Sequence, residues 1–67
     1  MIFIELEKLI GGNNNKKILF AVTEKISFIE INENMTDVLK KNIIIFRVTE
    51  SIEEIIYKLE QTNIKVI

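Results

Sequence analysis

The sequence predicts an α+β fold, in which a curved antiparallel β-sheet of about three to five strands carries one packed carboxyl-terminal helix. Two observations lead to this class. Apolar residues alternate with a period of two in segments before residue 49, whereas after residue 51 they follow the spacing of a helix. No proline, internal repeat or linker divides the chain, so we expect one small domain over residues 1–67.

The first segment predicts a β-hairpin. Ile2, Ile4 and Leu6 alternate with Phe3 and Glu5, which is typical of a half-buried strand over residues 1–6. Two glycines and three asparagines follow at residues 11–15. Because these residue types tolerate positive φ angles, we expect the chain to reverse there in a hairpin loop.

Residues 16–31 contain two apolar registers. An apolar set at even-numbered positions of residues 18–28 is followed by Ile29 and Ile31 at odd positions. One straight strand cannot bury both sets on the same face. The sequence therefore predicts a long, twisted strand that bends or bulges near residues 24–25, or a strand covered on both faces.

Residues 32–42 are compatible with two structures. Met35, Val38 and Leu39 have helical spacing, but the stretch is also short enough for a strand edge and a turn that closes at residues 40–42. The next segment is clearer. Four consecutive apolar residues rich in β-branching, followed by Arg47 and Val48, predict a buried strand over residues 43–48.

The last segment predicts a capped helix. Ser51 and Glu54 have the spacing of a capping box, and an apolar stripe continues through Ile52, Ile55, Ile56 and Leu59. Asn63 is suited to end this helix, and the apolar residues among 64–67 are expected to add a short strand. A strand, helix and strand over residues 42–67 would also fit the second half of a ferredoxin-like or ACT-like domain.

The composition argues against an enzyme. The chain has no histidine and no cysteine, and Arg47 is its only arginine, so the usual groups for acid–base, nucleophilic and zinc chemistry are missing. We therefore expect no catalytic residues, no cofactor and no metal. The longest apolar run is far too short to span a bilayer, and the first ten residues do not read as a signal peptide, so we expect a cytoplasmic protein.

Three polar groups are weak alternatives to this interpretation. The glycines and lysines of residues 11–17 superficially suggest a phosphate cradle, but Lys17 is followed by an apolar residue that opens a strand and not by Ser or Thr. The adjacent acids Glu53 and Glu54 are adequately explained as charges of a first helical turn. Residues 30–37 hold an oxygen-rich cluster suited to Ca²⁺ or Mg²⁺, but it lacks the spacing and the glycine of an EF-hand.

Association with a protein is the best-supported expectation. Apolar residues make up 48% of a chain that is too short to hide them readily in one core, and no disulfide or zinc site is available to stabilise it. The apolar run over residues 43–46 needs cover on both faces, whereas the one helix shields only one. The predicted partner-binding residues are Ile44, Phe46, Arg47, Lys40 and Lys41.

The order of these signals resembles the small flagellar FlbD-like family and its phage-encoded relatives. The resemblance is strongest over residues 48–59, and the matching residues are Leu9, Gly11, Ile29, Glu30, Thr36, Val48, Glu50, Ser51, Ile52, Glu53, Glu54 and Ile55. Unlike the family, this chain has Ile43 after Asn42 where a glycine-containing turn is usual, and residues 13–17 look inserted. The resemblance implies a small β-rich accessory protein without catalytic residues.

Two functions follow as expectations. The first is a non-enzymatic protein-binding accessory or inhibitor module that covers or bridges a partner surface and associates with itself as a homodimer. The alternative is a small nucleic-acid-associated regulator that uses Lys16, Lys17, Lys40 and Lys41. A net charge of −1 gives no strong field to attract nucleic acid or an anionic membrane, so protein is the expected partner.

Overall fold

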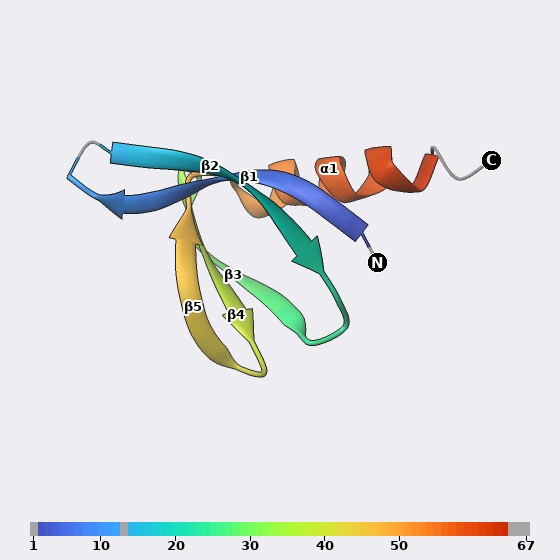
Figure 1. The fold of residues 1–67 in the computed structure, drawn as a ribbon, viewed down its shortest axis with the longest axis horizontal. Helices are drawn as coiled ribbons and strands as arrows, with labels where there is room; N and C mark the ends of the chain where they lie inside the picture. The colour runs from blue at the N-terminus through green and yellow to red at the C-terminus, as the bar shows by residue number, and fades with distance from the viewer. Residues whose placement is uncertain (1, 13, 65–67) are drawn as a thin grey trace.

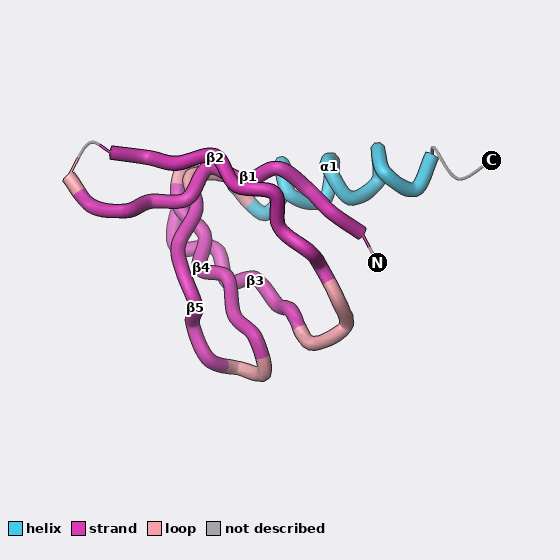
Figure 2. The backbone as a smooth tube through the Cα atoms, viewed as in Figure 1, coloured by secondary structure: helices cyan, strands magenta, loops and turns pink. Residues whose placement is uncertain are grey.

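The computed structural model describes residues 2–12 and 14–64, which form an open five-stranded antiparallel sheet with one helix packed on it (Figures 1 and 2). The α+β class predicted from the sequence is confirmed. None of the described segments is a helix long and apolar enough to cross a membrane. The elements are β1 (Ile2–Gly11), β2 (Asn14–Val22), β3 (Ile26–Asn32), β4 (Met35–Lys40), β5 (Ile43–Val48) and α1 (Ile52–Ile64).

The sheet consists of two parts that meet at one point. The strand order is β2-β1-β5-β4-β3, and every neighbouring pair is antiparallel. Strands β1 and β5 are joined at the single pair Lys8 and Val48, next to a hydrogen bond from the Thr49 amide to the Glu7 carbonyl at 3.0 Å. This short junction allows the β1–β2 hairpin to cross the end of the three-stranded part (Figure 1).

The core lies between the hairpin, the three-stranded part and the helix. Ile4 and Leu6 of β1 meet Val38 and Val48 from the three-stranded part, and Ile55 of α1 completes the buried cluster. The alternation on β1 places Ile4 and Leu6 on one face because side chains of a strand point to opposite sides in turn. The sheet therefore folds over on itself, and α1 covers part of the same core.

The opposite side of the three-stranded part faces away from this core. Ile29 pairs with Asp37, and Asp37 pairs in turn with Arg47, so these three form one row across the strands. Leu39 pairs with Ile44 in the adjacent row, two residues further along β4. Residues two apart on a strand share a face. We call the side that carries Ile29, Asp37, Leu39, Ile44 and Arg47 the outer face.

The prediction of one long strand over residues 16–31 is wrong. The chain turns between β2 and β3, with a hydrogen bond from the Ile26 amide to the Thr23 carbonyl at 3.1 Å. The two strands lie at opposite edges of the sheet, which a bend or bulge near residues 24–25 would not allow. The change from even to odd apolar positions has another cause, because Phe28 packs against the core whereas Ile29 and Ile31 are exposed. An irregularity in the pairing of β3 occurs later, between Glu30 and Asn32.

The other segments agree better with expectation, with one exception. The strand over residues 43–48 forms, but the prediction that it is buried is wrong, because Ile43, Ile44 and Ile45 are 69%, 56% and 43% exposed. Strand β1 extends to Gly11, beyond the predicted residues 1–6, and the hairpin reverses between Gly11 and Asn14. Of the two structures considered for residues 32–42, the strand and turn are present. Lys40 and Ile43 pair across a two-residue loop whose Lys41 and Asn42 have φ angles of 53° and 67°, the signs required by a type I′ turn.

The helix forms as its capping signals predict. The Ser51 amide donates to the Glu54 carboxylate at 3.2 Å, and the Glu54 amide donates to the Ser51 hydroxyl at 3.2 Å. The helix runs to Ile64 and so passes the predicted end at Asn63. The predicted terminal strand rested on residues 64–67. Ile64 is helical, and residues 65–67 lie outside the described residues.

Candidate functional site

A shallow groove lies on the outer face beside the tip of the β1–β2 hairpin. Residues 9–12 form one wall, and Met35 and Asp37 of β4 with residues 44–47 of β5 form the rest. The Ile44 and Ile45 side chains are 56% and 43% exposed there, and Ile10 on the hairpin is 59% exposed. We call this the β5 groove. It is a largely apolar surface built from three strands.

Apolar exposure is general in this molecule. Among the described residues, ten large apolar side chains are exposed, whereas six apolar side chains are buried. The outer face and the β5 groove hold four of the ten, namely Ile10, Ile29, Ile44 and Ile45. A small monomer with this ratio keeps much of its hydrophobic surface in water.

One ion pair lies at the centre of this apolar surface. The Arg47 Nε donates to Asp37 Oδ1 at 2.6 Å, and Nη2 approaches Oδ2 at 3.5 Å. The hydrogen bond to Asp37 raises the pKa of the Arg47 guanidinium, against a smaller opposing effect of desolvation. The Asp37 carboxylate is nearly buried, while 45% of the Arg47 side chain remains exposed. Arg47 therefore pairs with a carboxylate and also reaches solvent.

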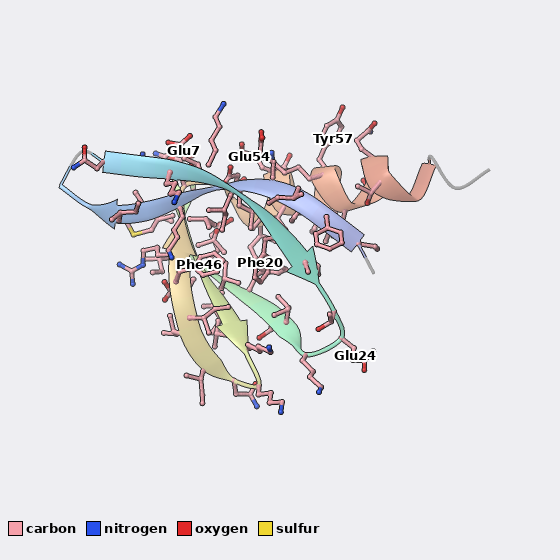
Figure 3. The ribbon with its side chains drawn as sticks, in the orientation of Figure 1. Glu7, Phe20, Glu24, Phe46, Glu54 and Tyr57 are labelled. Carbon is pink, nitrogen blue, oxygen red and sulfur yellow. The ribbon has the colours of Figure 1, made fainter. Side chains whose placement is uncertain are left out.

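Phe46 lies at the base of the β5 groove and also reaches inward. Its ring packs edge-on against Phe20 of β2, with centroids 5.1 Å apart and planes at 88° (Figure 3). The Lys8 ammonium lies 5.2 Å from the centre of the same ring. Phe46 therefore positions β5 against the hairpin, and little of it is left for a partner to contact.

The predicted lysines do not join this surface. Lys40 lies by a separate depression with Lys25 and Glu24, and Lys41 lies in the β4–β5 turn. Lys16 and Lys17 belong to β2 near the other hairpin tip, away from that turn (Figure 1). The structure thus brings Ile44, Phe46 and Arg47 together, but it separates them from Lys40 and Lys41. The four lysines form no common basic patch.

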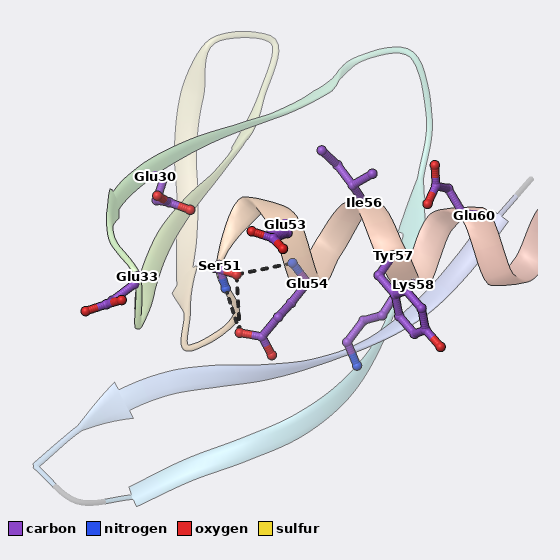
Figure 4. A pocket seen from close by; sticks show the side chains of 9 residues that line it. All are labelled: Glu30, Glu33, Ser51, Glu53, Glu54, Ile56, Tyr57, Lys58 and Glu60. Atoms are coloured by element: carbon purple, nitrogen blue, oxygen red, sulfur yellow. Dashed lines mark hydrogen bonds between the residues drawn. The ribbon is translucent and has the colours of Figure 1, made fainter.

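The acidic residues mainly stabilise the fold. The Glu30 carboxylate accepts a hydrogen bond from the Ile52 amide at 2.8 Å, and Glu54 closes the capping box with Ser51 (Figure 4). Asp37 lies on the outer face, whereas Glu30 points toward the start of α1, so the oxygen-rich residues considered as a weak alternative within residues 30–37 are divided. Within the described residues, no three His, Cys, Asp or Glu side chains group as metal ligands.

Asp37 is not among the predicted partner-binding residues, and Glu50 appears in the prediction only through the family resemblance. The Glu50 carboxylate accepts from the Glu7 amide at 3.0 and 3.1 Å, and the Glu50 carbonyl accepts from the Thr36 hydroxyl at 2.6 Å. These bonds tie the junction of β1 and β5 to β4. The turn at Lys41 and Asn42 alone would pair Asp37 with Phe46. The register shift between Val38 and Leu39 pairs Asp37 with Arg47 instead, and no local signal in the sequence predicts that shift.

No protein-family model matches the chain, and neither does any curated protein or solved structure with which it was compared. The resemblance to FlbD-like proteins therefore stays a prediction from the sequence.

Proposed function

We propose that this protein is a non-enzymatic protein-binding module, which acts by covering or bridging a surface of a protein partner through its outer face and β5 groove. The observation that supports this most directly is the exposure of Ile44 and Ile45 beside the ion pair of Asp37 and Arg47. Soluble monomers rarely expose large contiguous apolar patches unless the patch contacts another molecule.

The composition of the surface also fits a protein contact. The centre of an interface is typically depleted of unpaired charge and enriched in arginine and apolar side chains. Arg47 has its charge balanced by Asp37 at 2.6 Å, and 45% of its side chain is exposed in the groove that it lines with Ile44. Such an arginine supplies apolar contact and hydrogen-bond donors to a partner. Its desolvation cost on binding is reduced because its counterion, Asp37, belongs to the same surface.

The biological setting is proposed from the sequence. The resemblance to FlbD-like proteins suggests a cytoplasmic accessory or inhibitor protein of the kind found in phage or flagellar operons. A module of this type needs no catalytic group, because occupying a surface on a larger protein is sufficient to block or recruit it.

Affinity capture with matched baits tests the proposal. Wild-type protein, the outer-face variant Ile44→Asp and the control Leu19→Asp are immobilised and exposed to lysate of the cells in which the protein occurs. Leu19 is 72% exposed on β2, so the control makes the same chemical change outside the proposed surface. We expect one protein to be retained in stoichiometric amount by wild type and Leu19→Asp and lost with Ile44→Asp. Equal retention by all three baits, or no retention by wild type, would contradict the proposal.

A further inference from the structure

We infer that the outer face binds a second copy of this chain, so that two protomers pack outer face to outer face about a two-fold axis. The inference rests on the proposed function, because both assign the outer face to a protein contact. It adds the identity of the occupant and the symmetry of the contact. A different protein that uses the same face would compete with the second copy, so its capture would be accompanied by dissociation of the dimer.

Charge is the first reason for choosing a second copy. An interface about a two-fold axis must be complementary to itself. The outer face carries one acid and one base, Asp37 and Arg47, which already neutralise each other at 2.6 Å. It therefore presents no excess charge that would repel its own copy or require a partner of opposite sign. Its exposed apolar surface is isoleucine at residues 29 and 44, beside the uncharged Ser27.

The accessible area is the second reason. The chain exposes 5006 Å², whereas a monomeric protein of 7.8 kDa is expected to expose about 4,400 Å². The difference of about 600 Å² is of the same order as the roughly 800 Å² that each partner buries in a stable interface. One self-contact of ordinary size would bring the exposed area of each protomer near the value expected for its mass.

The architecture suits such a contact. Two sheet faces pack as layers about 10 Å apart, with side chains from both faces interdigitating. The outer face spans β3, β4 and β5, and the hairpin tip at residues 9–12 borders it along the β5 groove. A two-fold axis through this face places the tip of each protomer, with the exposed Ile10, beside the sheet of the other.

Sedimentation equilibrium over a wide concentration range tests the inference on four proteins, which are wild type, Ile44→Asp, Ile29→Asp and the control Leu19→Asp. Wild type and Leu19→Asp are expected to reach twice the mass of 7.8 kDa. Each outer-face variant should raise the dimer dissociation constant about 100-fold or more, because association would bury a carboxylate without a partner. Circular dichroism checks that the variants stay folded, which we expect since Ile29 and Ile44 are 54% and 56% exposed.

The outcomes separate this inference from the proposed function. A wild-type dimer that both outer-face variants dissociate supports the inference. A monomeric wild type, or a dimer that survives Ile29→Asp and Ile44→Asp, overturns it. If wild type is monomeric but captures a different protein that Ile44→Asp loses, the inference fails while the proposed function stands. If that capture also fails, both are overturned.

Discussion

Replacing Leu6 with alanine is expected to lower the free energy of unfolding by about 2–5 kcal/mol, the range for truncating a fully buried leucine. The Leu6 side chain has no exposed area and packs against Val38, Val48 and Ile55 where the hairpin crosses the three-stranded part. A domain of this length is stabilised by only about 3–10 kcal/mol in total. Urea denaturation should therefore show a large loss of stability or an unfolded variant.

Leu19→Ala is the matched control for this prediction. This variant makes the same substitution on β2, but the Leu19 side chain is 72% exposed. The free energy of unfolding should therefore change by no more than about 0.5 kcal/mol. If Leu6→Ala and Leu19→Ala shifted the urea midpoint equally, the hairpin would not close over the core as described.

Replacing Glu50 with alanine should cost about 1.5–3 kcal/mol, the range for hydrogen bonds to a charged group. Both Glu50 carboxylate oxygens accept from the Glu7 amide, and only 9% of this residue is exposed. The substitution leaves that amide without its partner at the point where β1 and β5 are joined by a single pair, Lys8 and Val48. Thermal unfolding followed by circular dichroism measures the loss.

Glu53→Ala separates this effect from the general loss of an acid near the helix. Glu53 is exposed in the first turn of α1 and makes only a dipole contribution of about 0.3–1 kcal/mol. Glu50→Ala should therefore be the more damaging of the two. A smaller effect at Glu50 than at Glu53 would mean that the carboxylate does not hold the β1–β5 junction.

Local sequence signals predicted the parts of this fold that depend on neighbouring residues. The strand Ile43–Val48 follows from its β-branched run, and the start of α1 follows from Ser51 and Glu54 three residues apart. These features can be predicted from the sequence because strand alternation, side-chain branching and capping each depend on residues only a few positions apart.

The path of residues 16–31 could not be predicted from local sequence signals. A change from even to odd apolar positions is equally produced by a bend, a bulge or a change of partner strand. Here the chain leaves β2 at one sheet edge and starts β3 at the other, with a turn that closes between Thr23 and Ile26. Long-range pairing decides between these possibilities, and no local signal reports it.

The candidate surface was predicted only in part, again because long-range strand pairing decides which residues meet. Ile44 and Arg47 belong to one strand, but they are three residues apart, so simple alternation would place them on opposite faces. The register shift between β4 and β5 brings them together in the β5 groove. Lys40 and Lys41 were grouped with them by closeness in sequence, but the turn directs them elsewhere. Asp37 enters the surface from β4, and recognising it requires knowledge of the register between β4 and β5.

Backbone amide NMR spectra recorded over protein concentrations that bracket the dimer dissociation constant test most directly the central claim that the outer face binds a second copy of this chain. We predict that raising the concentration shifts or broadens the signals of Ile29, Ile44 and Arg47 on the outer face, while those of Leu19 and Tyr57 on other surfaces stay in place. A spectrum that does not change with concentration, or changes centred on Leu19 and Tyr57, would contradict the account.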